Sequence, residues 1–132
     1  MEPEVKAFVD AIGAMEPDQN STLYAAYRQF FRRRSYFLFK GQFLIVKISR
    51  SEKPFWGLGK KYVDLLNGTE NYFLVLLTSA RDGYVFTKNE INQFIKKGRW
   101  RLGTGDQYKI NYPLPDRSSF RSPENFLVKT NL

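Results

Sequence analysis

Lys47 is the residue whose type and position first suggest chemistry. It lies in a run of bulky and β-branched residues, from Gln42 to Ser49, that is apolar on both faces of the predicted strand apart from this lysine. Such strands are usually covered on both sides, and an ammonium ion there needs a partner or a purpose. We expect either that its amine reaches water at the end of the strand or that Lys47 is a catalytic residue.

Basic residues are interleaved with aromatic residues in three further stretches, RQFFRRRSYFLFK, KPFWGLGKK and KKGRWRLG. Lys and Arg neutralise phosphates, whereas the faces of Trp rings can stack on bases. A run of charge is often only a solvated surface, but the span from Ser21 to Ser51 contains no acidic residue. The predicted nucleic-acid-binding residues are Arg28, Arg32, Arg33, Arg34, Arg50, Trp56, Lys60, Lys61, Lys96, Lys97, Arg99, Trp100 and Arg101.

The stretch KPFWGLGKK has two interpretations. Two glycines precede Lys60 and Lys61 at a predicted helix start, where backbone N–H groups can hold a phosphate. The spacing is not that of a P-loop. Alternatively, the glycines allow close packing, and Phe55 and Trp56 both belong to the core.

The composition excludes several kinds of site. The 132 residues include no His and no Cys, which excludes disulfides, zinc fingers, iron–sulfur ligation and imidazole bases. Any catalysis must use carboxylates, Lys, Tyr, Ser or a metal held by oxygen ligands. The net charge of +8 predicts a polyanionic partner, nucleic acid before a membrane surface. The acidic start and the lack of a long apolar run predict a cytoplasmic protein without a membrane partner.

Hydrophobic periodicity and capping signals predict the elements that position these residues. Helices are expected at residues 3–14 and 20–33, from Pro54 to Gly68, from Thr87 to Gly98, and after Ser122. Strands are expected at residues 36–39, 42–49, 72–79, 84–86 and 107–112, the last as an edge strand ended by Pro113.

The fold class that follows is α/β (α+β), a single domain over residues 1–132 with a mixed central β-sheet flanked by helices. Charge divides this domain, because residues 1–20 hold five acidic residues and one lysine. We therefore expect an acidic N-terminal helix over residues 1–19 and a basic α/β core over residues 20–132. The acidic helix is either an intramolecular cover or a contact in a homo-oligomer.

Residues 20–97 resemble the core of the restriction-endonuclease-like (PD-(D/E)XK) nucleases, which include Holliday-junction resolvases. In that family a central strand carries an acid and a lysine two residues apart, and a preceding strand adds an Asp, so that these side chains share a metal-bound water. FLIVKIS looks like this strand, with Lys47 in the lysine position, and GYVFTKNEINQFI looks like the strand and helix that close many of those domains.

The sequence departs from that family at the carboxylates. Ile45 stands two residues before Lys47, and the preceding strand, SYFLFKG, has Ser35 where an Asp is expected. Mg²⁺ needs carboxylate oxygens, and Glu16, Glu52 and Asp64 are the candidates for ligands at displaced positions. The resemblance therefore implies a degenerate nuclease fold.

Three functions follow from these patterns. The first is a nucleic-acid-binding protein, with DNA the expected partner, that has a degenerate nuclease-like fold and no cofactor. The second is a Mg²⁺-dependent endonuclease of restriction or repair type, in which Lys47 stabilises developing negative charge. The third is an interaction module for an acidic protein partner.

Overall fold

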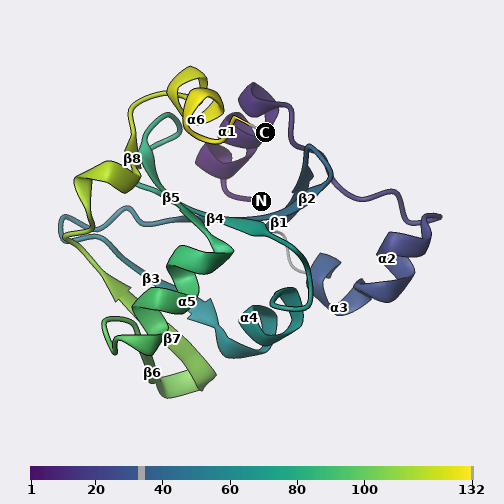
Figure 1. Ribbon diagram of the computed structural model, residues 1–132. Helices are drawn as coiled ribbons and strands as arrows, with labels where there is room; N and C mark the ends of the chain where they lie inside the picture. Colours follow the sequence, from purple (N-terminus) through teal and green to yellow (C-terminus); the bar gives the residue numbers. More distant parts are fainter. Residues whose placement is uncertain (33–34, 132) are drawn as a thin grey trace.

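A five-stranded mixed sheet forms the centre of the computed structural model, which describes residues 1–32 and 35–131 (Figure 1). Its strand order is β1-β2-β4-β5-β8. Strands β2 and β4 are parallel, and the other neighbours are antiparallel. The strands are β1 (Tyr36–Phe39), β2 (Gln42–Ile48), β4 (Tyr72–Leu77), β5 (Gly83–Thr87) and β8 (Ser119–Phe120).

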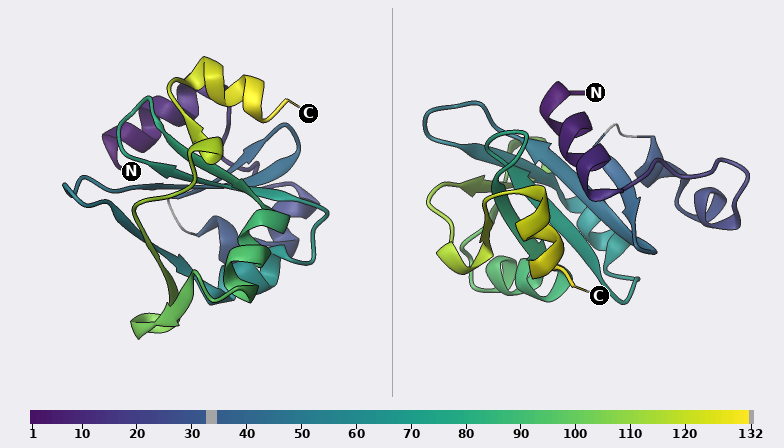
Figure 2. Two further views of the ribbon diagram at one scale, coloured as in Figure 1. Left: turned by 60° about the vertical axis from the view of Figure 1, so that its left-hand side comes forward. Right: turned by 90° about the horizontal axis from the view of Figure 1, so that it is seen from above.

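Elements cover the central sheet on both faces (Figures 1 and 2). Helices α1 (Pro3–Ile12) and α6 (Pro123–Lys129) lie on one face. The other face carries α3 (Arg28–Phe31), α4 (Lys60–Leu66) and α5 (Lys88–Lys96), together with a second sheet of order β3-β7-β6. Its strands are β3 (Phe55–Gly59), β7 (Gln107–Asn111) and β6 (Arg101–Gly103). The single small α+β domain with a mixed sheet is confirmed.

The predicted hairpin of β1 and β2 is confirmed, with Lys40 and Gly41 as its turn. Both have positive φ, 49° and 79°, which is the geometry of a tight two-residue hairpin turn. Alternation along β2 places Leu44 in the core under α1 and α6, and Ile45 in the opposite core. The prediction that β2 is covered on both sides is therefore confirmed.

Local signals also predicted three helices correctly. The apolar face of α1 packs on the central sheet and against α6, so that in this structure the acidic helix is an intramolecular cover. Thr87 and Glu90 form the predicted capping box of α5, and the Ser122 hydroxyl accepts a hydrogen bond from the Asn125 N–H at the start of α6. Within the described residues, no helix is long and apolar enough to cross a membrane.

Three predicted elements were wrong in type or extent. Residues 55–59 form a strand rather than the start of a helix, because all five pair with β7, and the side chains of Trp56 and Leu58 are buried. Strand β7 is central rather than an edge strand, since β6 pairs with its other side. The helix expected over residues 20–33 is broken at Tyr27 into α2 (Thr22–Ala26) and α3. Arg33 and Arg34 lie outside the described residues.

Candidate nucleic-acid interface

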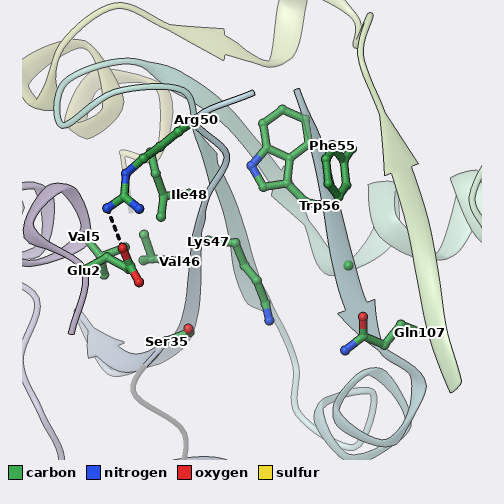
Figure 3. A pocket seen from close by; sticks show the side chains of 11 residues that line it. Glu2, Val5, Ser35, Val46, Lys47, Ile48, Arg50, Phe55, Trp56 and Gln107 are labelled. Carbon is green, nitrogen blue, oxygen red and sulfur yellow. Dashed lines mark hydrogen bonds and ion pairs between the residues drawn. The ribbon is translucent and has the colours of Figure 1, made fainter. Parts of the chain in front are cut away.

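The carboxyl end of β2 opens into a cleft. Strand β1 pairs with β2 only as far as Ile45, after which the Val46 N–H donates to the Ser35 carbonyl at 2.8 Å. A cavity of about 410 Å³ lies beside this end, between β2, the start of α1, and β3 (Figure 3). Ligand sites in open sheets typically lie outside the carboxyl ends of strands, so this cleft is a natural place for a bound group.

Lys47 lines this cleft and also a second cavity of about 220 Å³. Its side chain extends into the space between β2 and β3, and its Nζ lies 6.0 Å from the centre of the Tyr36 ring (Figure 3). Gln107 lines both cavities as well, and Lys61 and Asp106 line the second. Lys47 therefore extends into a cleft rather than into the apolar core, a placement that fits both expectations for it.

The carboxylates that a metal-dependent nuclease would need do not come together. Asp64 pairs with Lys60 on α4, Glu52 is exposed on the loop after β2, and Glu16 lines a different cavity beside Arg32. Within the described residues, no three Asp, Glu, His or Cys side chains form a group that could hold a metal ion. Two carboxylates share a cavity with Lys47: Glu2, which is paired with Arg50, lines the first cavity, and Asp106, from a short 3₁₀ turn that the sequence pattern did not single out, lines the second.

Arg50 is held by two glutamates at the start of α1. Its Nε donates to a Glu4 carboxylate oxygen at 2.7 Å, its second terminal nitrogen donates to the other Glu4 oxygen at 2.7 Å, and Glu2 accepts a further short hydrogen bond (Figure 3). The hydrogen bond from Arg50 lowers the pKa of Glu4 to about 2, and a backbone N–H adds to this effect. Arg50 was predicted to grip a phosphate, but here its charge is already neutralised within the chain.

Acid should weaken the contact between α1 and Arg50. The pKa of Glu4 is depressed from 4.5 to about 2, so its stabilising effect is complete above pH 4.5 and is lost as the pH falls towards 2. We expect Glu4→Gln to reduce the fall in unfolding free energy across this range, measured by urea unfolding at several pH values. Arg50→Gln should remove the same part of the fall in unfolding free energy, and the double variant should remove no more than either single variant. An unchanged pH profile in Glu4→Gln would contradict this assignment.

The two tryptophans predicted to stack on bases are both buried. Trp56 is 3% exposed, and its Nε1 donates to the Leu77 carbonyl at 3.3 Å. Trp100 is 4% exposed and stacks on Phe94, with ring centres 4.7 Å apart. Neither ring offers a face to a base, so these two predictions were wrong. The exposed aromatic residues in this region are Phe55, at 60%, and Tyr112, at 54%, and the alternative interpretation had placed Phe55 in the core.

The glycines before α4 have a packing role. Gly57 and Gly59 lie in β3, and a Cβ on Gly57 would stand 2.2 Å from the Gln107 side-chain oxygen. Gly57 therefore leaves room for Gln107 to lie across β3. This agrees with close packing rather than with a phosphate held by the backbone at the start of α4.

Among the other predicted cations, some converge and others are neutralised. Lys60 pairs with Asp64, whereas Lys61 lies with Lys47 around the second cavity. Arg28 and Arg32 line a cavity of about 460 Å³ beside α4. Lys97 and Arg99 line one of about 430 Å³ with Arg117, and Lys96 ends α5.

Two cations that the sequence pattern missed complete these groups. Lys109 lies directly opposite Arg101 in the pairing of β6 with β7, and Arg117 joins Lys97 and Arg99. The alternation Tyr108, Ile110 already placed Lys109 on the outer face of its strand, but only the pairing of β6 brings Arg101 beside it.

Comparisons with protein-family models, with curated proteins and with solved structures found no match to this chain.

Proposed function

We propose that this chain binds nucleic acid, with DNA as the expected partner, through the layer formed by α3, α4, α5 and the β3-β7-β6 sheet. The observation that carries the proposal is the gathering of cations on this layer, on the opposite side of the central sheet from the acidic helix α1. Arg28, Arg32, Lys61 and the basic residues from Lys96 to Arg101 all belong to this layer or to its connecting turns. The acidic helix α1 lies on the opposite face.

Most of the ion pairs between described residues lie outside this layer. Five ion pairs join described residues, and three of them engage Glu2, Glu4 and Asp10 of the N-terminal segment. In the cationic layer, one such pair joins Lys60 to Asp64, while none of the five involves Arg28, Arg32, Lys61, Lys97, Arg99 or Arg101. These cations therefore remain available to a polyanion, which would release its condensed counterions on binding.

The Mg²⁺-dependent nuclease, the acidic protein partner and the restriction-endonuclease-like architecture stay predictions. The nuclease would need carboxylates that hold a metal ion beside Lys47, and its test is cleavage in Mg²⁺ or Mn²⁺ that disappears in Lys47→Ala. Binding to phosphates needs neither a metal ion nor carboxylates. It needs only cations, and the fold places several of them on one layer.

Titration of the protein with duplex DNA tests the proposed function. If about four cations each neutralise one phosphate, the affinity should fall roughly 100-fold between about 50 and 200 mM salt, with little dependence on base sequence. Fluorescence anisotropy of labelled duplexes of different sequence, at several salt concentrations, measures the salt dependence and the sequence dependence of the affinity. The absence of binding at about 50 mM salt would overturn the proposal.

A further inference from the structure

The outward face of the β3-β7-β6 sheet is basic and carries no carboxylate. The register pairs Phe55 with Asn111, Gly57 with Lys109, Arg101 with Lys109, and Gly103 with Gln107. Residues paired across neighbouring strands share a face, and the buried Trp56, Leu58, Tyr108 and Ile110 occupy the inner one. The outward set is Phe55, Gly57, Gly59, Arg101, Gly103, Gln107, Lys109 and Asn111, which adds two positive charges, two amides and one aromatic ring.

Two side chains of this face lie over glycines of the neighbouring strands. A Cβ on Gly57 would stand 2.2 Å from the Gln107 side-chain oxygen, and one on Gly103 would stand 3.0 Å from Cε of Lys109. The Lys109 stem therefore lies along β6 beside Arg101, and Gln107 lies across β3. The outward residues therefore form a strip of cations and amides, with Phe55 at the end where β3 begins and with Phe55 and Gln107 also lining the cleft of Lys47.

Phe55 is exposed and borders the cleft of Lys47, whereas the next residue of the same strand is buried. It is 60% exposed, while the adjacent Trp56 is buried against Tyr84 and hydrogen-bonded to Leu77. It is also the single large apolar side chain among the eight outward residues of this sheet. A protein interface would need a wider apolar centre than one ring, whereas one ring beside cations is enough for a base and its phosphates.

We infer that this face binds single-stranded nucleic acid, with Phe55 stacking on a base while Arg101 and Lys109 contact phosphates. The inference rests on the proposed function and deepens it by naming the form of the ligand. Bases in a duplex are stacked on one another and offer no face to Phe55, so a duplex would gain only the phosphate contacts. A single strand gains both, because its bases are free to unstack onto the ring.

The test compares three ligands with equal numbers of phosphates per strand: a thymine oligonucleotide of about ten nucleotides, an abasic strand of the same length, and the corresponding duplex. Binding of each to the wild-type protein, Phe55→Ala and Phe55→Trp is measured at one low salt concentration. Phe55→Ala should weaken binding of the thymine strand roughly tenfold and leave the abasic strand unchanged. Phe55→Trp should retain or increase the affinity for the thymine strand. Val128→Ala, at an exposed apolar residue of α6 on the opposite face, is the matched control and should bind all three ligands as the wild type does.

The outcomes separate this inference from the proposed function. If the abasic strand binds as tightly as the thymine strand, or Phe55→Ala binds both as the wild type does, base stacking is overturned while nucleic-acid binding stands. If polyglutamate binds as tightly as the thymine strand, the face recognises charge alone and the inference again fails. If the wild type binds none of the nucleic acids, both are overturned. Urea unfolding of Phe55→Ala confirms that the variant is folded.

Discussion

Trp56→Ala is expected to lower the free energy of unfolding by about 3–5 kcal/mol, the largest effect on stability that we predict. The ring is 3% exposed, packs edge-on against Tyr84 and donates a hydrogen bond to the Leu77 carbonyl. Truncation would leave a cavity between the two sheets and would remove one of the two hydrogen bonds that the Leu77 carbonyl accepts, the other coming from the Ser49 N–H at 3.1 Å. Urea unfolding followed by circular dichroism measures the change.

The neighbouring residue provides the matched control. Phe55→Ala should change the free energy of unfolding by less than about 1 kcal/mol, because that side chain is mostly in water. Trp56→Phe should fall between the two, since it keeps most of the apolar volume and loses the hydrogen bond. Equal effects of Phe55→Ala and Trp56→Ala on the free energy of unfolding would contradict the placement of Phe55 on the exposed face of β3 and of Trp56 on its buried face.

Removal of both Arg101 and Lys109 should give the largest loss of nucleic-acid affinity that we predict. Each cation that neutralises a duplex phosphate contributes about 0.9 to the slope of log affinity against log salt concentration, so the double alanine variant should lose about 1.8. The affinity should fall at least tenfold at about 50 mM salt and converge with that of the wild type at high salt. Labelled-duplex titrations over a range of salt concentrations measure the slope.

A second double variant controls for overall charge. Lys6→Ala with Arg81→Ala also removes two positive charges, but these residues pair with Asp10 and with Glu124 of α6, away from the β3-β7-β6 sheet. Its salt slope should match that of the wild type. Equal slopes in both double variants would show that net charge, rather than the Arg101 and Lys109 pair, determines binding.

Local signals predicted a large part of the fold. The positive φ of Lys40 and Gly41, the capping box of Thr87 and Glu90, and the apolar stripe of α1 all depend on residues within a few positions of one another. The pattern of β2 likewise showed that both of its faces are covered. These features need no knowledge of distant partners.

The errors fall where a distant partner decides the outcome. Residues 55–59 pair with residues 107–111, about fifty positions along the chain, and that pairing makes them a strand and turns Trp56 inward. In the sequence, Phe55 and Trp56 are adjacent aromatic residues beside lysines, and either could have been the exposed one. Likewise, the sequence predicted that Arg50 binds a phosphate, whereas in the structure it pairs with Glu4 of α1. Asp106 lines a cavity with Lys47, and it comes from a turn that no sequence motif indicates.

By itself, the sequence determined the local elements, the acidic start and the acid-free basic segment that follows it. It also determined that Lys47 lies two residues after an isoleucine rather than an acid. Only the tertiary structure decided which cations are neutralised, which aromatic ring is exposed, and which side chains share a cavity with Lys47. The reason is physical: backbone preferences act over a few residues, whereas burial and ion pairing depend on contacts between segments far apart in the chain.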